Sequence, residues 1–280
     1  MELVDYIIPV CSVGGQDAIE RVSNLQYVID GFLSRQTGVT INLIIAEQIC
    51  TPFRPVTEQI TLPKYAKVIR VKHEPFNKGW LQNIGVRHAE SEHIVFGDLD
   101  CCYLNNGGIK DLISFVEKRA LKWCIGWNKI IYIGQHCKRS LISENILLPD
   151  DLENLPQSKL QCHEGGIVYF NRTFLENELG GSNEFFRDLR GMDNAIAARA
   201  RATSGQNLRM YNELIHLYHP WSPMKDSEHR PYNKKILNFT VKYPFDVNKM
   251  LIKMREHGLL GNPEYPASKV TSFYHQRTHL

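Results

Sequence analysis

Short apolar runs alternate with amphipathic stretches along the chain. Apolar residues recur at helical spacing between Ile19 and Leu33, whereas residues 39–46 form a continuous β-branched run, typical of a strand buried on both faces. Strands are predicted at 6–10, 39–46, 67–73, 93–97, 123–133, 165–170 and 208–217, and helices at 19–33, 77–91, 109–121, 173–178, 193–202 and 247–257. This alternation predicts an α/β fold with a parallel sheet that is covered by helices.

The chain length indicates one large domain with a smaller addition. A chain of 280 residues suits a single α/β core. We expect residues 1–222 to form this core and residues 223–280 to form an extension, in which prolines surround one amphipathic helix near 247–257. Residues 135–163 are polar and irregular, and long insertions of this kind are usually functional or mobile.

Composition narrows the class of protein. An apolar fraction of 43% is enough for a full core, and a net charge of +3 neither requires nor excludes a polyanionic partner. The seven cysteines show no CxxC spacing, so reduced thiols in a cytoplasmic protein are the simpler interpretation. The segment 1–15 lacks the basic start of a signal peptide, and no stretch approaches about 18 apolar residues. We therefore expect a soluble protein with no transmembrane segment.

Two carboxylates follow the strand predicted at 93–97. Asp98 and Asp100 lie where the chain leaves the sheet, and two acids so placed can hold a divalent cation that neutralises a diphosphate. An isolated Asp-x-Asp is often only a solvated turn. The position after a buried strand favours function here, because open α/β sheets bind ligands at the carboxyl ends of their strands.

Three further motifs place polar groups or glycines at the start of predicted elements. Lys78 and Asn83 belong to a helix for which Asn77 is the expected cap, and helix N-termini also attract phosphate. Gly165 and Gly166 follow an acid and precede a strand, and glycines let a ligand approach the backbone closely. Asp193 begins an Ala-rich helix, where an acid also interacts favourably with the helix dipole without any further function.

Two histidines, His216 and His219, lie at the end of the strand predicted at 208–217. Strand alternation sends residues three apart to opposite faces, so one metal ligand is expected rather than two. An isolated histidine more often serves structure. In a chain that also carries an Asp-x-Asp, a histidine at a strand end favours a nitrogen ligand.

The order of these motifs resembles that of the GT-A fold glycosyltransferases, especially family 2 and the related galactosyltransferase C-terminal region. The resemblance covers residues 3–221 and is carried by NKGWLQNIGVRHA, IVFGDLD, EGGIVYFNRTFLENELGGSNEFF, GMDNAIAARA and HLYHP. It implies a Rossmann-like, mixed but mainly parallel sheet flanked by helices, with a C-terminal helical and irregular extension. It also implies a nucleotide-sugar binding half, 1–105, and an acceptor and catalytic half, 106–222.

The resemblance implies a role for each matching residue. Asp100 matches the residue that binds catalytic Mn²⁺ or Mg²⁺, His219 matches the third metal ligand, and Asp193 matches the general base of inverting members. Asp98 and His216 are further candidate ligands of the metal. The residues expected to contact the nucleotide-sugar are Pro9, Val10, Glu47, His73, Lys78, Asn83, Asp98, Gly165 and Gly166.

The chain departs from the related pattern at two places. Residues 189–193 read Leu-Arg-Gly-Met-Asp where related galactosyltransferases carry Trp-Gly-Gly-Glu-Asp, so the aromatic platform and the first acid are missing while the base remains. Residues 46–48 read Ala-Glu-Gln in place of the Asp-Asp-Gly-Ser common in family 2. These departures leave the donor sugar, the acceptor contacts and the nucleotide base open.

The sequence therefore predicts a metal-dependent, inverting glycosyltransferase that moves a sugar from a nucleotide-sugar, with a UDP-sugar favoured, to an acceptor hydroxyl in glycan or polysaccharide synthesis. The acceptor stays open between a glycan, a lipid-linked sugar, a protein and a modified nucleic-acid base. A sugar-phosphate nucleotidyltransferase is the alternative enzyme, but the loop at 12–15 lacks the basic residue that such enzymes carry. An inactive scaffold is the other alternative, although the predicted acids and His219 are all present.

Overall fold

A mixed six-stranded sheet forms the centre of the molecule. The computed structural model describes residues 1–12, 15–72, 76–135, 164–187, 191–220 and 229–264. The strand order is β3-β2-β1-β4-β8-β6. The strands are β1 (Glu2–Cys11), β2 (Val39–Ile49), β3 (Lys67–Lys72), β4 (His93–Gly97), β6 (Trp123–Ile125) and β8 (Ile167–Asn171). The first four are parallel and β8 runs antiparallel to both of its neighbours, which confirms the predicted, mainly parallel α/β sheet.

The central strand β1 is longer than its neighbour β4. β1 pairs with β2 from Glu2 to Cys11, whereas its pairing with β4 ends where Ile7 meets Phe96. The end of β1 therefore overhangs the point at which β4 ends and the chain leaves the sheet at Asp98. This step lies at the carboxyl edge, where α/β sheets bind their ligands.

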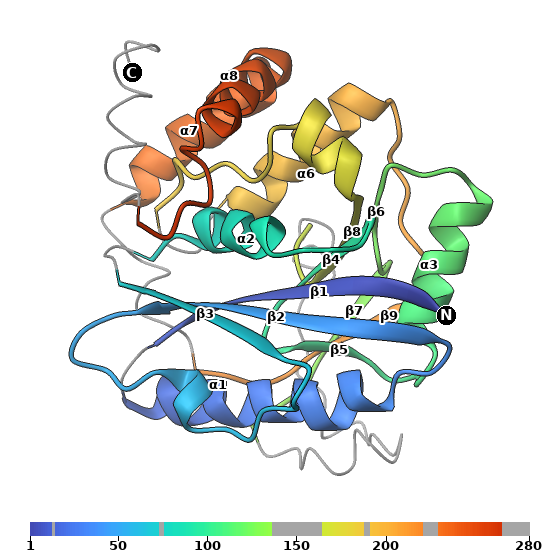
Figure 1. Ribbon diagram of the computed structural model, residues 1–280, viewed down its shortest axis with the longest axis vertical. Coiled ribbons are helices and arrows are strands. Elements are labelled where there is room, and N and C mark those ends of the chain that lie inside the picture. The colour runs from blue at the N-terminus through green and yellow to red at the C-terminus, as the bar shows by residue number, and fades with distance from the viewer. Residues whose placement is uncertain (13–14, 73–75, 136–163, 188–190, 221–228, 265–280) are drawn as a thin grey trace.

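Helices cover both faces of the sheet (Figure 1). The helix α1 (Gly15–Tyr27) lies on one face, and α2 (Lys78–Arg87) and α6 (Met192–Ser204) lie on the other. Asn77 caps α2 as predicted, because its side chain accepts a hydrogen bond from the Trp80 backbone N–H at 2.9 Å. The helix α3 is Gly108–Lys118, and shorter helical turns span Val28–Phe32, Leu33–Arg35, Val56–Glu58 and Phe174–Glu178.

A second, three-stranded sheet has the order β5-β9-β7. It consists of β5 (Cys101–Tyr103), β7 (Lys129–Tyr132) and β9 (Glu213–His216), and the last of these is shorter than the strand predicted at 208–217. In the antiparallel β5–β9 pair, Cys101 lies opposite His216. This pairing brings the segment after the Asp-x-Asp beside the predicted histidines.

The prediction of a single strand at 123–133 is wrong. The run forms β6 in the large sheet and β7 in the small one, with Gly126 between them. The Gly126 N–H donates to the Ile167 carbonyl at 2.9 Å, and a Cβ at Gly126 would lie 2.2 Å from the Tyr103 hydroxyl oxygen. The chain passes between the sheets here because glycine leaves room for Tyr103.

The C-terminal part contains two helices, α7 (Arg230–Lys242) and α8 (Pro244–Glu256), where the sequence predicted one. They form an outer layer beyond α6 (Figure 1). One apolar cluster joins them to the preceding region, with the members Phe185, Phe186, Met192, Ala195, Ile236, Val247, Leu251, Met254 and Leu260. The extension thus shares a core with α6, and the boundary at residue 222 stays a prediction.

Within the described residues, none of the helices combines the length and the apolar character needed to cross a membrane.

Candidate active site

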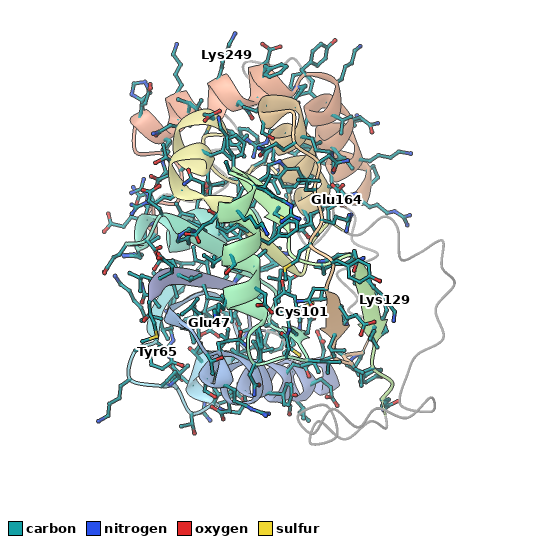
Figure 2. All side chains as sticks on the ribbon, turned by 90° about the vertical axis from the view of Figure 1, so that its right-hand side faces the viewer. Glu47, Tyr65, Cys101, Lys129, Glu164 and Lys249 are labelled. Atoms are coloured by element: carbon teal, nitrogen blue, oxygen red, sulfur yellow. The ribbon has the colours of Figure 1, made fainter. Side chains whose placement is uncertain are left out.

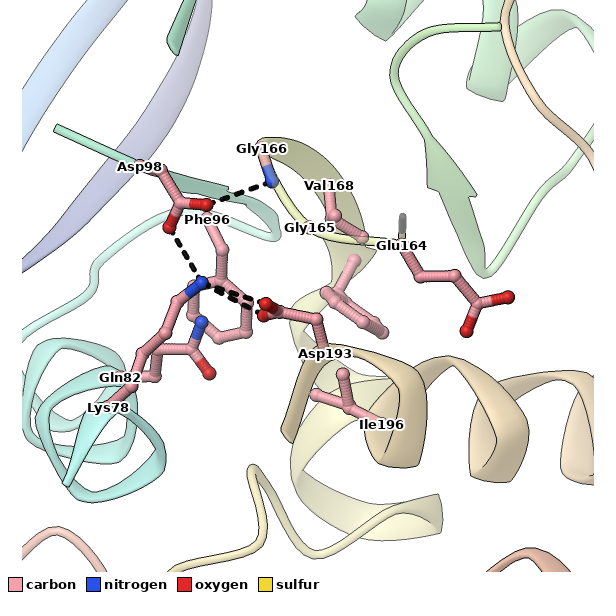
Figure 3. A pocket seen from close by; sticks show the side chains of 11 residues that line it. Lys78, Gln82, Phe96, Asp98, Glu164, Gly165, Gly166, Val168, Asp193 and Ile196 are labelled. Atoms are coloured by element: carbon pink, nitrogen blue, oxygen red, sulfur yellow. Dashed lines mark hydrogen bonds and ion pairs between the residues drawn. The ribbon is translucent and has the colours of Figure 1, made fainter. Parts of the chain in front are cut away.

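A lysine ammonium joins two carboxylates at the carboxyl edge of the sheet. The Lys78 Nζ atom lies 2.7 Å from Asp98 Oδ1, and 2.9 and 3.1 Å from Asp193 Oδ1 and Oδ2 (Figure 3). Lys78 begins α2, Asp193 lies in the first turn of α6, and Asp98 directly follows β4. Two helix N-termini and one strand end thus meet at the same point.

The charges of this trio depend on one another. Burial by itself lowers the pKa of Lys78, but Asp193 and Asp98 outweigh burial and hold that pKa well above its usual value. Burial raises the pKa of Asp98, and the charges of Asp193 and Asp100 raise it further, while Lys78 opposes them. Lys78 is therefore a fixed cation that holds the two acids together.

The paired glycines form the wall beside this trio. The Gly166 N–H donates to Asp98 Oδ2 at 3.0 Å, and the Asp98 N–H donates to the Gly166 carbonyl at 2.9 Å. Gly166 has a φ of +89°, which a side chain would strain. A Cβ at Gly165 would lie 2.7 Å from Asp193 Oδ2. The absence of side chains at both positions lets the backbone approach the carboxylates.

A cavity of about 10 Å³ lies among these groups, enough for about one water. Its lining consists of Lys78, Gln82, Phe96, Asp98, Glu164, Gly165, Gly166, Val168, Phe170, Asp193 and Ile196. The lining combines lysine, glutamine and carboxylate groups with aromatic and aliphatic side chains (Figure 3). A small cavity lined by both charged and apolar groups can orient one polar group of a ligand.

Asp100 lies in a second cluster, with both histidines. The His219 Nε2 atom lies 3.2 Å from Asp100 Oδ2. One ligand atom each of Asp100, Cys101 and His216 lie within 4.8 Å of one another, and the two imidazole rings are 5.5 Å apart. The prediction that strand alternation separates the two rings is wrong, because β9 ends at His216 and alternation does not continue to His219.

The donor set of this cluster fits a divalent cation. Burial raises the pKa of Asp100, but His216 and His219 outweigh burial and bring that pKa well below its usual range. Burial also raises the pKa of the Cys101 thiol well above its usual value, and the charges of Asp100 and Asp98 act in the same direction. Asp100, Cys101 and His216 thus offer a carboxylate, a thiol and an imidazole, and His219 adds a second imidazole 3.2 Å from Asp100 Oδ2. Carboxylate and imidazole donors together suit a first-row divalent ion.

Glu47 and Asn83 form hydrogen bonds with other segments of the chain, and neither residue lines the cavity. Glu47 is fully buried, and its carboxylate accepts hydrogen bonds from the Val56 backbone N–H and the Thr57 hydroxyl. The Asn83 Nδ2 group donates to the Ser182 carbonyl at 2.9 Å and to Glu184 Oε1 at 2.8 Å. Contact with a nucleotide-sugar stays a prediction for both residues.

Of the other residues predicted to contact the nucleotide, two lie at the carboxyl edge of the sheet and one lies outside the described residues. Pro9 and Val10 are buried near the end of β1, opposite Ala46 and Glu47 of β2. Their backbone therefore belongs to the overhang above Asp98. His73 lies outside the described residues.

Two polar residues that line the cavity, Gln82 and Glu164, were not among the predicted site residues. The Gln82 Oε1 atom accepts a hydrogen bond from the Ser182 hydroxyl at 2.6 Å, which fixes the orientation of the amide. Gln82 lies four residues after Lys78 on α2, and this spacing places both on one helix face. Helical spacing from Lys78 was thus a usable signal for Gln82. Glu164 directly precedes Gly165 in the quoted motif.

By sequence, this chain matches neither a protein-family model nor a curated protein. By structure, it is similar to S. aureus TarS 1–349 in complex with UDP-GlcNAc, with 11% identity and a TM-score of 0.55 over 86% of this chain and 66% of that one. It is also similar to M. tuberculosis glucosyl-3-phosphoglycerate synthase, with 14% identity and a TM-score of 0.53 over 88% of this chain and 81% of that one. A complex of that synthase with Mn²⁺, UDP and glucosyl-3-phosphoglycerate gives 14% identity and a TM-score of 0.52.

These similarities establish the fold. The chain has the GT-A glycosyltransferase fold that its motifs predicted, with a mainly parallel sheet flanked by helices. The chain spans just under two thirds of the TarS 1–349 structure, at 66% of its length.

Proposed function

We propose that this chain is a metal-dependent glycosyltransferase that transfers a sugar from a nucleotide-sugar, favouring a UDP-sugar, to an acceptor hydroxyl with inversion. The supporting observation is the contact of Lys78 with both Asp98 and Asp193, next to the Asp100 and histidine cluster. The similar TarS structure contains UDP-GlcNAc, and the similar synthase structure contains Mn²⁺ and UDP. We further propose a role in glycan or polysaccharide synthesis and a cytoplasmic setting, and the free state of the described cysteines supports the second of these.

Asp100, His216 and His219 are the residues that would hold the metal. Magnesium prefers oxygen ligands, so two imidazoles beside one carboxylate favour Mn²⁺ over Mg²⁺. When bound, a divalent cation stabilises the negative charge of the donor diphosphate as the sugar leaves. Lys78 adds a second, permanent positive charge on the Asp98 side of the site.

Asp193 is the proposed general base. A carboxylate offers about four lone-pair sites, and Lys78 uses two of them, so Asp193 can still accept the proton of an acceptor hydroxyl. Gly165 leaves the Asp193 carboxylate uncovered on the cavity side, since any Cβ there would lie 2.7 Å from Oδ2. Lys78 orients this carboxylate while Asp98, tied to Gly166, fixes the lysine from the other side.

The test is the anomeric form of the sugar that the protein releases from α-linked UDP-sugars with Mn²⁺, followed by ¹H NMR with water as the acceptor. Release of the β-anomer before mutarotation supports inversion, and release of the α-anomer contradicts it. A lack of release from UDP-, GDP-, CMP- and dTDP-sugars alike contradicts the transferase and favours the inactive scaffold.

A further inference from the structure

A groove of about 580 Å³ runs along α6 beside the cavity that contains Asp193. Its volume lies within the range of about 300–1,000 Å³ that is usual for ligand sites. One wall is a single face of α6, formed by Asn194, Ala198, Arg201 and Ala202, which recur at helical spacing. The groove therefore follows α6 for about two turns.

The groove begins next to the proposed base. Asn194 directly follows Asp193, and Glu164 lines both the groove and the cavity. One end of the groove therefore lies next to Asp193 along α6. The opposite wall comes from α7 and the start of α8, in the extension beyond the residues that carry the family resemblance.

The two walls differ in chemistry. Leu237, Val241 and Pro244 form an apolar wall, and Val241 is 57% exposed. On the side of α6, Arg201 and Glu164 form a two-pronged ion pair, with Arg201 Nη2 donating to Glu164 Oε2 at 3.1 Å. Planar charged groups of this kind still have hydrogen-bonding capacity toward hydroxyls.

We propose that this groove binds an uncharged oligosaccharide, whose terminal sugar is the acceptor; the proposal rests on the proposed transferase function. The C–H faces of sugar rings pack on the apolar wall, and their hydroxyls bond to Glu164, Arg201 and Asn194. Among the described residues of the lining, the one cation and the one anion pair with each other, so this part of the lining has no net charge. A groove for nucleic acid or phosphate-bearing lipid needs an excess of positive charge.

The experiment uses variants that place a bulky side chain in the groove at exposed positions, outside the core. Ala202 is exposed on α6, so Ala202→Trp places a large ring in the groove. Val241→Trp does the same from the opposite wall and serves if the first variant fails to fold. The matched control is Lys249→Trp, because Lys249 is exposed on the outer surface of α8, away from Glu164 (Figure 2). Circular dichroism and thermal unfolding check that each variant is folded.

The readout is saturation-transfer-difference NMR with cello-, malto-, xylo- and chito-tetraose, in the absence of any donor. We expect at least one tetraose to bind the wild type and the Lys249→Trp control equally. We expect Ala202→Trp to bind it at least about tenfold more weakly, which corresponds to about 1.4 kcal/mol.

Three results overturn the inference. These are equal tetraose binding by Ala202→Trp and the wild type, no binding of any tetraose to the wild type, and binding of duplex DNA or anionic vesicles that Ala202→Trp abolishes. Because the NMR experiment needs no donor, it tests tetraose binding in the groove independently of sugar transfer. If a tetraose binds but no sugar is released from any nucleotide-sugar, the proposed function is overturned, whereas the assignment of the groove as an oligosaccharide site is retained.

Discussion

Replacing Lys78 by methionine leaves two carboxylates facing each other without their shared cation. A hydrogen bond to a charged group contributes about 1.5–3 kcal/mol, and breaking a fully buried pair costs about 3–5 kcal/mol. The Asp98 and Asp193 side chains are 28% and 26% exposed, so solvent screens part of their repulsion. We therefore expect Lys78→Met to lower the free energy of unfolding by about 2 kcal/mol at pH 8. At about 2–4 °C per kcal/mol, Tm falls by about 4–8 °C.

The pH dependence has a definite sign. The raised pKa of Lys78 means that its stabilising contribution is complete below about pH 10.4, the pKa of an unfolded lysine, and is lost only at higher pH. Burial raises the pKa of Asp98 and Lys78 opposes that rise, so without Lys78 the Asp98 carboxylate binds protons more readily in the folded than in the unfolded state. The stability loss of Lys78→Met should therefore shrink as the pH falls from 8 to 4.

The assay is urea unfolding of the wild type, Lys78→Met and the exposed control Lys249→Met at pH 8, 6 and 4. The double variant Lys78→Met/Asp193→Asn should recover part of the loss, because it removes one unpaired charge. The reasoning is refuted if Lys78→Met stays within about 0.5 kcal/mol of the wild type at pH 8, the usual range for surface substitutions, or if its loss grows on acidification.

Three further predictions concern the same network. Asp193→Asn should lower sugar transfer by about 10²–10⁴-fold in steady-state kinetics while nucleotide-sugar binding persists, because the base is lost but an oxygen for Lys78 remains. Gly165→Ala should lower transfer by up to about 10²-fold with little change in Tm, since its Cβ would displace the Asp193 carboxylate from a distance of 2.7 Å. Burial raises the pKa of Glu184 to about 7, against the hydrogen bond from Asn83, so wild-type stability should decline as the pH rises from 5 to 8. Glu184→Gln should remove that decline, which is at most about 3 kcal/mol in urea unfolding; an unchanged slope contradicts the assignment.

The local pattern of apolar residues predicted the strands of the central sheet, but it predicted only one of the two helices of the outer layer. The apolar run at 93–97 predicts β4, which spans His93–Gly97. The helix α7 was not predicted, although Tyr232, Ile236 and Phe239 recur along it at helical spacing, and its buried positions also include the polar residues Asn233 and Thr240. The Asn233 Oδ1 atom accepts a hydrogen bond from the Arg187 N–H at 3.0 Å, so tertiary contacts satisfy a polar group that the sequence pattern assigns to solvent.

The candidate site was likewise predictable from the sequence only in part. Motifs identify Lys78 and Asp193 as functional candidates, but their contact is a product of the topology and not of local spacing. The approach of His216 to the segment after Asp98 depends on the register between β5 and β9, which no local pattern encodes. Glu47 and Asn83 are buried polar residues whose hydrogen-bond partners lie within the protein. The sequence alone does not distinguish a residue with such structural hydrogen bonds from one that contacts a ligand.

The central claim is a nucleotide-sugar site that depends on a metal held by Asp100, and thermal unfolding with UDP-sugars in the presence and absence of Mn²⁺ tests it most directly. We predict that Tm rises only when both are present, with a stabilisation of about 2.7 kcal/mol at a ligand concentration 100-fold above Kd, and that Asp100→Ala abolishes the rise. A rise that needs no Mn²⁺, a rise that persists in Asp100→Ala, or no rise with any UDP-sugar contradicts the claim.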